Sequence, residues 1–248
     1  HSFPTRRSSD LFDPSSELSH LFHVSPNCHG INKPSKYFCF VTETSRFPPL
    51  DIAFVVSATA VAVDGNFKHI KSTIESIIKE HGVKKHLYAL VVFGRTAKVV
   101  FPFRKDPNKA TLVSKIKKTR PVPGPVDVVN ALRETKKLFF SPEGGARPDS
   151  RKIIVVMIDH KTVNSGFDIL DIAAELDVAK VRFVTVVIGN ETNLNELVPL
   201  TPDKDKANIV KADNDSNPNA TGKFIWDVMS IGKNTTLFPI TVGVFTKH

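Results

Sequence analysis

The sequence predicts an α/β protein with a doubly wound, mostly parallel central sheet and helices on both faces. Two observations predict it. Continuous apolar runs of strand length, at residues 51–56, 87–93 and 153–158, are typical of strands buried on both faces. Segments whose apolar residues recur at helical spacing separate these runs. Because strands that alternate with helices pair in parallel through crossover connections, the helices are expected to cover both faces.

The first half of the domain begins with the strand at residues 51–56. Apolar residues then recur at helical spacing up to Gly82, which is placed to end that helix. After the strand at 87–93, the alternating segment 97–103 predicts an edge strand. Two further helices are expected at 109–119 and 126–140, and the segment 141–148 is expected to be a loop because it contains Pro and Gly.

The second half continues the same alternation. The central strand at 153–158 ends on Asp159, and ligands of such sheets bind beyond the carboxyl ends of the strands. The remaining predicted elements are a helix at 167–179, a strand at 183–188, a short helix at 194–200, a short strand at 208–211 and a last amphipathic helix at 222–231.

The chain has 248 residues, enough for one domain and its tails. Residues 1–11 match the translation of a widely used sequencing adapter, so we expect a library artefact outside the fold. The Pro-rich segment 12–49 predicts a linker or the edge of a preceding module. We place the domain at 50–233 and interpret 234–248 as a tail or the start of a truncated module.

Both cysteines, Cys28 and Cys39, lie in the linker segment. Three alternatives stay open for them: they pair with each other, each pairs with a cysteine missing from this chain, or both are reduced. Two cysteines exclude a disulfide-dense scaffold and a four-cysteine zinc site. No apolar run reaches the roughly 18 to 20 residues that a transmembrane helix needs.

The chain is basic, with 34 Lys and Arg against 25 Asp and Glu and a net charge of +9. Two basic clusters supply candidate polyanion-binding residues: Lys84, Lys85, Lys117 and Lys118. They predict either a surface for sulfated glycosaminoglycan or solvated helix ends that complement the helix dipole. Aromatic residues do not interleave with these clusters, which argues against nucleic-acid binding.

No catalytic motif is present: the sequence has no His-Glu-x-x-His, no phosphate loop and no Gly-x-Ser-x-Gly elbow. Ser57, Asp159 and His160 are the one conceivable triad, at the ends of neighbouring strands. Residues adjacent on a strand point to opposite faces, so Asp159 and His160 are expected to diverge. The sequence therefore predicts that the protein is not an enzyme.

Several separated segments together resemble one known family. They are residues 51–56, 66–67, 91–94, 151–159 and 186–189. In this order they resemble a von Willebrand factor type A domain over about residues 50–232. The resemblance implies a Rossmann-like α/β fold. It also implies a non-enzymatic adhesion domain of a larger protein, secreted or extracellular, that binds an extracellular or matrix protein.

The resemblance also implies where a metal-ion-dependent adhesion site would lie. In the family an Asp-x-Ser-x-Ser motif follows the first strand, a Thr precedes the third helix and an Asp follows the fourth strand. Here Ser57 stands at the Asp position, Thr59 at the first Ser and Val61 at the second. Asp159 is retained and is followed by His160, where the family usually has Gly.

Two further positions complete the comparison with the family's metal site. The family's loop Thr is replaced by Pro125 or Val126, and Asp127 lies close enough to offer a substitute carboxylate. Mg²⁺ prefers six oxygen ligands, and this site has lost a carboxylate and two hydroxyls. We therefore expect no cofactor and metal-independent binding, with a modified Mg²⁺ or Mn²⁺ site through these residues as the alternative.

Four Asn-x-Ser/Thr sequons lie in the last 60 residues. Their acceptors are Asn190, Asn214, Asn219 and Asn234. On an extracellular fold they predict a secreted glycoprotein. Chance occurrence in an Asn-rich tail is the alternative.

Overall fold

The computed structural model describes residues 48–58, 65–104, 108–201, 204–205, 208–212 and 216–230, without the side chains of 190 and 191. The predictions for 1–11, most of 12–49, Cys28, Cys39 and 234–248 concern residues outside this part. The strands are β1 (Leu50–Ser57), β2 (Leu87–Phe93), β3 (Ala97–Phe101), β4 (Arg151–His160), β5 (Arg182–Glu191) and β6 (Val210–Ala212). The α-helices are α1 (Asn66–His81), α2 (Lys109–Lys118), α3 (Val128–Phe140), α4 (Gly166–Val178), α5 (Leu194–Leu197) and α6 (Pro218–Ser230).

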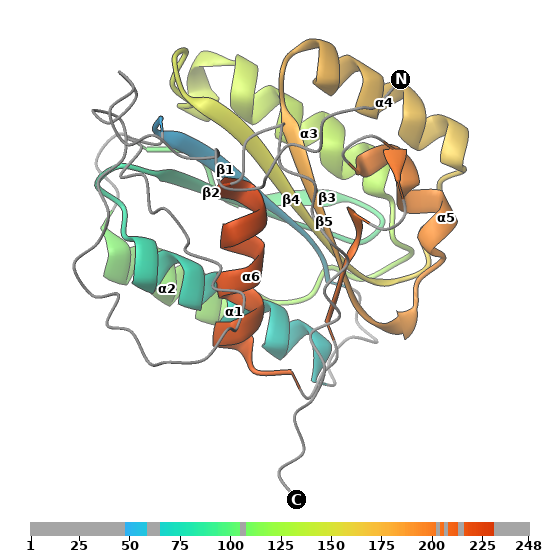
Figure 1. The fold of residues 1–248 in the computed structure, drawn as a ribbon, viewed down its shortest axis with the longest axis horizontal. Helices are drawn as coiled ribbons and strands as arrows, with labels where there is room; N and C mark the ends of the chain where they lie inside the picture. The colour runs from blue at the N-terminus through green and yellow to red at the C-terminus, as the bar shows by residue number, and fades with distance from the viewer. Residues whose placement is uncertain are drawn as a thin grey trace, which may run out of the picture. The chain divides into compact units, whose positions relative to one another are not determined.

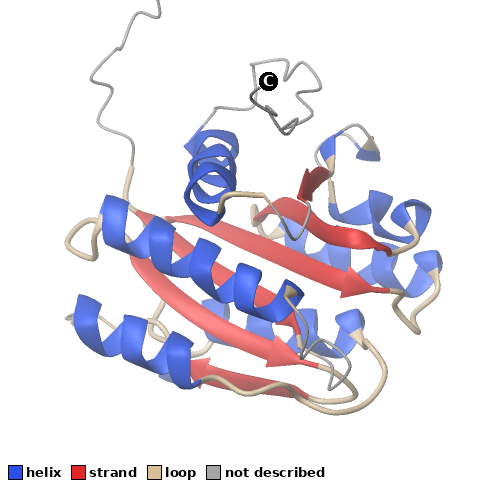
Figure 2. Cartoon of the chain, turned by 90° about the horizontal axis from the view of Figure 1, so that it is seen from below, coloured by secondary structure: helices blue, strands red, loops and turns tan. Residues whose placement is uncertain are grey.

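The strands of the described residues form one sheet in the order β3-β2-β1-β4-β5-β6. Every neighbouring pair is parallel except β2 and β3, and Figure 2 shows the sheet with helices on both sides. The predicted doubly wound α/β fold is therefore confirmed. The strand order reverses between β1 and β4, and the crevice at the carboxyl ends of these two strands is where such folds bind ligands.

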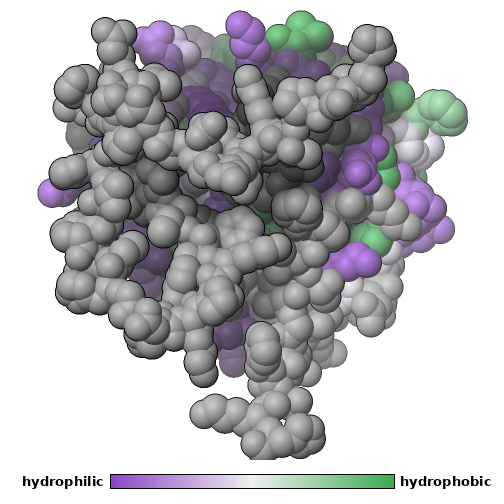
Figure 3. Space-filling view, viewed as in Figure 1, coloured by the Kyte–Doolittle hydropathy of each residue, from purple (hydrophilic) through white to green (hydrophobic). Residues whose placement is uncertain are grey.

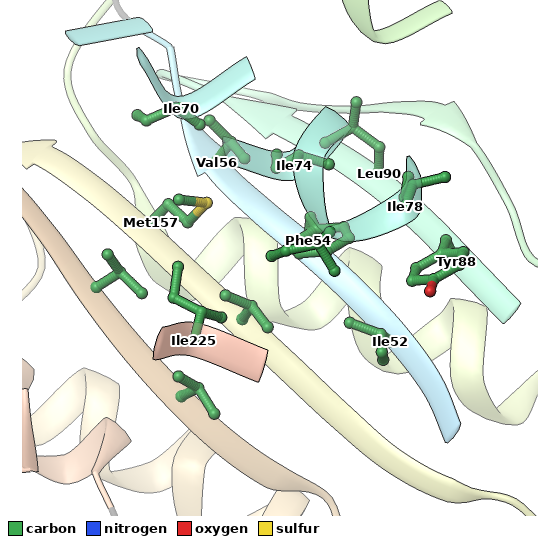
Figure 4. Packing of buried hydrophobic residues seen from close by; sticks show 14 of the residues in the cluster. Ile52, Phe54, Val56, Ile70, Ile74, Ile78, Tyr88, Leu90, Met157 and Ile225 are labelled. Atoms are coloured by element: carbon green, nitrogen blue, oxygen red, sulfur yellow. The ribbon is translucent and has the colours of Figure 1, made fainter. Parts of the chain in front are cut away.

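Two hydrophobic layers enclose the sheet. Helices α1, α2 and α6 cover one face and α3 and α4 cover the other (Figure 1). All eight residues of β1 are buried, as expected for a central strand between two helical layers. In Figure 4, Phe54 of β1 lies among Ile74 and Ile78 of α1, and its ring is stacked 6.1 Å from that of Tyr88. The sheet is thus packed on both faces and positions the loops at its ends.

Helix ends depart from the predicted bounds for identifiable reasons. Helix α3 begins at Val128, two residues later than predicted, because the Asp127 side chain accepts a hydrogen bond from the Asn130 N–H and caps the helix. Helix α6 begins at Pro218, four residues earlier than predicted, since proline suits a first helical position. Both shifts follow from the residues at the start of the helix, and the spacing of apolar residues does not reveal where a helix is capped.

An ion pair between the buried Asp51 and the partly buried Arg147 holds the amino end of β1. Asp51 is fully buried, and its carboxylate accepts hydrogen bonds from the Arg147 backbone N–H (2.6 Å), the Arg147 Nε (2.9 Å) and the Ser150 hydroxyl (2.6 Å). The Arg147 guanidinium also donates to the carbonyl oxygens of Leu50 and Lys85. Both carboxylate oxygens of Asp51 are satisfied, so this end of the strand is closed by a structural contact.

Candidate functional site

Ser57 and Asp159 meet at the carboxyl ends of β1 and β4, in the crevice where the strand order reverses. Both are buried, at 0% and 1% exposure. The Ser57 hydroxyl donates to Asp159 Oδ1, and the Asp159 backbone N–H donates back to Ser57 Oγ at 3.1 Å. The serine that replaces the family's first aspartate is therefore bonded to the aspartate that remains.

The second carboxylate oxygen of Asp159, Oδ2, is buried and has no hydrogen-bond partner among the described residues. His160 lies beside the same carboxylate, with Nδ1 3.1 Å from Asp159 Oδ1. The prediction that Asp159 and His160 point to opposite faces is wrong. The pairing of β4 with β5 shifts register between Ile158 and His160, and such an irregularity removes the strict alternation of a strand.

Asp127 lies in the loop that borders this crevice, but its carboxylate is already engaged. Oδ1 accepts from the Asn130 backbone N–H at 3.0 Å, as the cap of α3, and from Asn164 Nδ2 at 3.1 Å. Asn164 in turn accepts from the Val129 N–H through Oδ1. The structure thus uses Asp127 to join α3 to the loop after β4.

Hydrogen bonds connect three loops at this end of the sheet. Val126 pairs with Thr162, and the Val126 carbonyl accepts from the Thr162 hydroxyl (2.8 Å) and the Val163 N–H (3.0 Å). The Asp127 N–H donates to the carbonyl of Gly94. A Cβ at Gly94 would lie 2.4 Å from the Val122 carbonyl oxygen, so these loops approach as closely as glycine permits. We call residues 94–96, 121–127 and 159–168 the upper loops.

The described side chains do not fit a Mg²⁺ site. An octahedral ion needs several independent oxygen ligands. Here the Ser57 hydroxyl and the Asp159 carboxylate are hydrogen-bonded to each other. At the family's loop Thr, Pro125 is exposed and Val126 is buried, and neither offers a side-chain oxygen. The described part of the chain holds no group of three His, Cys, Asp or Glu side chains suited to a metal. Thr59 and Val61 lie outside the described residues.

The upper loops expose side chains that the sequence analysis did not single out. Val163 is 59% exposed and Phe167 is 82% exposed, and Lys161 and Arg95 are exposed as well. Figure 3 shows hydrophobic spots along the rim where Figure 1 draws α4, the helix that carries exposed Phe167 at its start and exposed Val178 at its end. One sequence pattern could have predicted this exposed apolar pair: a valine and a phenylalanine four residues apart, in the polar stretch that follows the central strand.

The two predicted basic clusters lie in different places. Lys117 of α2 and Lys79 of α1 converge on Glu75, at 3.9 and 3.1 Å. Lys118 is exposed beside Lys117, whereas Lys84 and Lys85 are exposed in the turn before β2, next to Arg147. The structure therefore joins the second cluster to α1 and leaves Lys84 and Lys85 at the amino end of the strands.

Only one of the four sequons has a described acceptor side chain. Asn219 is exposed in the first turn of α6, while Thr221 of the same sequon is buried and its hydroxyl donates to the Asn217 carbonyl. Asn190 belongs to β5, but its side chain is outside the described residues, as are Asn214 and Asn234. Within the described residues, no helix has the length and apolar character to cross a membrane.

The fold and the polar crevice define the class: a doubly wound α/β domain whose retained aspartate lies at the reversal of strand order. A profile of the von Willebrand factor type A domain matches residues 51–223, and the chain belongs to this family.

Adhesion and matrix proteins are among its relatives. The chain is 24% identical to mouse integrin alpha-M over 146 residues, which cover 58% of this chain and 12% of that protein. It is 26% identical to mouse matrilin-1 over 154 residues, covering 60% of this chain and 30% of matrilin-1. The chain thus spans less than a third of either relative.

Solved structures show the same fold. Proximal thread matrix protein 1 from the mussel byssus, solved with a zinc-occupied MIDAS motif, matches with a TM-score of 0.60 and 20% identity, over 74% of this chain and 45% of that one. A von Willebrand factor type A protein from Catenulispora acidiphila matches with a TM-score of 0.58 and 12% identity, over 74% of this chain and 42% of that one. At these identities the likeness concerns the fold alone.

Proposed function

We propose that this domain is a non-enzymatic adhesion module that binds an extracellular or matrix protein without a metal ion. One observation carries the proposal: Ser57 and Asp159 are hydrogen-bonded to each other at the position where the family holds its ion. Replacing the family's aspartate by serine removes a negative charge that a divalent cation needs. The remaining nearby carboxylate, Asp127, is committed to capping α3.

The kinship with integrins and matrilin-1 supports an adhesion or matrix role. It also supports the proposal that the domain is secreted and that Asn219, the exposed sequon acceptor, carries a glycan. Because Thr221 is buried in α6, the glycan would have to be added before the helix folds. Asn190, Asn214 and Asn234 remain further proposed acceptors.

The proposal is tested by binding of the full chain to a surface coated with decellularised extracellular matrix. Binding is measured once in chelator and once with millimolar Mg²⁺, for the wild type and for Asp159→Ala. We expect equal binding under both conditions. Binding that disappears in chelator and in Asp159→Ala would contradict metal independence.

A metal-dependent form of the same function is the second candidate, and one observation favours it. Asp159 Oδ2 is buried and has no partner in the part of the chain that the structure describes, and an orphaned carboxylate oxygen is costly unless something binds it. Mg²⁺ or Mn²⁺ is the ligand this candidate requires, with Ser57, Thr59 and Asp159 as its donors.

Sulfated glycosaminoglycan binding is the third candidate, favoured by the exposure of Lys117 and Lys118 at the end of α2. Such binding releases counterions and weakens steeply with salt. Retention on immobilised heparin should fall with salt and should fall further in Lys117→Glu/Lys118→Glu. Retention of Lys84→Glu/Lys85→Glu tests whether the other cluster contributes, and the absence of retention for the wild type would contradict the candidate.

A further inference from the structure

Helix α4 is apolar on two of its sides. Its inner side packs against the sheet through Ile169, Ile172 and Leu176, which are all buried. A second row, at spacings of four, three and four residues, is exposed along its whole length: Phe167, Asp171, Ala174 and Val178. Residues at this spacing lie on one face of a helix, and a surface helix normally keeps its outer face polar. Because three members of this row are apolar, the outer face of α4 is suited to packing against another helix.

Helix α3 lies beside α4 (Figure 1) and also ends in an exposed apolar residue. Nζ of Lys136 on α3 is 2.8 Å from Oε2 of Glu175 on α4, so the two helices are level at this pair. Both helices lead into the amino end of a parallel strand, β4 and β5, and therefore run in the same direction. Phe140, 49% exposed, follows Lys136 by four residues, and Val178, 85% exposed, follows Glu175 by three. The two apolar residues thus lie at nearly the same level along the helices.

A groove of about 480 Å³ opens beside Phe140. Its lining comes from α3 and the residue after it, with one residue from α4: Arg133, Lys136, Lys137, Phe140, Ser141 and Glu175. The aliphatic stems of the long side chains and the ring of Phe140 give the groove apolar walls, whereas the cationic head groups extend toward water. Such a groove accepts an apolar side chain that is accompanied by carboxylates.

The charges on α3 and α4 have opposite signs. Helix α3 carries three cations and one carboxylate, which are Arg133, Lys136, Lys137 and Glu134. Helix α4 carries four exposed carboxylates and no cation: Asp168, Asp171, Glu175 and Asp177. Two ion pairs link some of these groups within the domain, Lys136 with Glu175 and Lys137 with Glu134. Arg133, Asp171 and Asp177 lie outside these two pairs, so a basic row and an acidic row lie side by side.

We propose that α3 and α4 together form a face through which two copies of this chain associate, about a two-fold axis that runs parallel to both helices. Such an axis places α3 of each copy over α4 of the other. The cations of α3 then meet the carboxylates of α4 twice, and Val178 of each copy enters the groove beside Phe140 of the other. The inference goes beyond the proposed function, because this association requires neither a metal ion nor an adhesion ligand.

Charge complementarity selects a second copy as the occupant of this face. A partner with a basic surface would match α4 but would oppose the cations of α3, and a partner with an acidic surface would match α3 alone. A second copy offers both signs in adjacent rows. A two-fold axis that runs across the helices would place α3 over α3 and α4 over α4, which opposes like charges. The axis parallel to the helices is therefore the one that the charges favour.

The size of the face sets the strength of the association. Each helix has 13 residues and is about 20 Å long, and packed helices lie about 10 Å apart. A face of about 20 Å by 20 Å is at the small end of specific interfaces. We therefore expect a reversible dimer whose population rises with protein concentration.

Sedimentation velocity of the full chain over a range of concentrations, in chelator, tests the proposal. We expect the wild type to change from monomer to dimer as its concentration rises. Val178→Asp places a charge in the groove at both contacts, so the dissociation constant of the dimer should rise about tenfold or more. Because Val178 is 85% exposed, the substitution should leave the fold intact, which circular dichroism checks.

A charge exchange tests the placement of α3 over α4. Arg133 lies three residues before Lys136 and Asp171 four before Glu175, so the proposed axis brings Arg133 of one copy opposite Asp171 of the other. Arg133→Glu and Asp171→Arg should each weaken the dimer about tenfold, because like charges then face each other at two places. The double variant should return the dissociation constant to within about threefold of the wild type. Lys68→Glu, an exposed charge reversal on α1 across the sheet, is the matched control and should change it less than about twofold.

Each other outcome would overturn the proposal. A wild type that stays monomeric would do so, whether α4 is then open, covered by another part of the chain or used by a different protein. A dimer that Val178→Asp leaves unchanged, or that the double variant fails to restore, would contradict the placement of α3 over α4. Association that continues beyond the dimer would contradict a closed two-fold interface. Association that appears only when Mg²⁺ is added would assign it to an ion instead of this face.

Discussion

Each end of the sheet holds a buried aspartate: Asp51 of β1 at the amino end and Asp159 of β4 at the carboxyl end. The two carboxylates differ in how many of their oxygens have hydrogen-bond partners. Asp51, at the amino end, uses both carboxylate oxygens in contacts with Arg147 and Ser150. Asp159, at the carboxyl end, uses one oxygen toward Ser57 and leaves the other without a described partner. A domain stabilised by its buried charges would satisfy both. The amino end is therefore closed by a structural contact, whereas the carboxyl end keeps one acceptor oxygen without a partner among the described residues.

Removing the cation at the amino end should have the largest effect. In Arg147→Met, Asp51 keeps its negative charge in a fully buried position without its partner. We expect the free energy of unfolding to fall by about 3–5 kcal/mol, measured by denaturant unfolding. Arg133→Met, at an exposed position on α3, is the control and should change stability by less than about 0.5 kcal/mol. A loss below about 1 kcal/mol for Arg147→Met would remove the contrast between the two ends.

Gly94→Ala should perturb the upper loops at their closest approach. The new methyl group would lie 2.4 Å from the backbone oxygen of Val122, so one loop must move. We expect a loss of about 1–3 kcal/mol in thermal or denaturant unfolding. Gly166→Ala makes the same change at the first residue of α4, where nothing lies within 4 Å, and should be neutral or slightly stabilising. Equal effects would show that the packing of the loops is looser than described.

Acid should weaken the amino end through His86. Burial, together with Lys85, His81 and Arg147, lowers the pKa of His86 from 6.5 to about 4. The His86 Nδ1 accepts a hydrogen bond from the Leu50 N–H, and its ring packs edge-on against Trp226. The unfolded chain takes up the proton at a higher pH than the folded chain. The stability that His86 contributes is therefore present above pH 6.5 and is lost as the pH falls toward about 4.

The loss that this single residue causes should be about 1–3 kcal/mol over that window. It is measured as the difference in pH dependence of unfolding between the wild type and His86→Gln, because other histidines titrate in both proteins. The variant should show the flatter profile. Parallel profiles would contradict the assignment to His86.

Asp159→Asn should have the smallest effect on stability. The substitution removes a buried charge and keeps an acceptor for the Ser57 hydroxyl. We expect the free energy of unfolding to stay within about 1 kcal/mol of the wild type, because relief of the desolvation cost offsets any lost contact. The matched variant Asp51→Asn should lose clearly more, since it weakens four hydrogen bonds at once. A large loss for Asp159→Asn would assign Asp159 a structural role.

The sequence was sufficient for the layers of this fold but not for its loop contacts. The apolar run at 51–56 and the spacing of Ile70, Ile74 and Ile78 predict a central strand and the helix that covers it, and both are confirmed. These patterns repeat along one segment, so local spacing reveals them. The ion pair of Asp51 with Arg147 joins residues 96 positions apart, and no pattern in the sequence around either residue predicts it.

The candidate site was predictable in position but not in detail. The resemblance to the family nominated Ser57 and Asp159, and the predicted strand ends placed both at one edge of the sheet. The turn of His160 toward Asp159 depends on a register shift between β4 and β5, which no single segment encodes. Asp127 could have been recognised as a helix cap, because aspartate before an apolar-periodic segment is a capping signal.

Calorimetric titration of Mg²⁺, and then of Mn²⁺, into the chelator-stripped full chain tests the central claim most directly, with Asp159→Ala as the paired variant. The engagement of Ser57 with Asp159 predicts no saturable binding up to millimolar ion in either protein. One-to-one binding to the wild type that vanishes in Asp159→Ala would contradict metal independence and would assign the unpartnered oxygen of Asp159 to an ion.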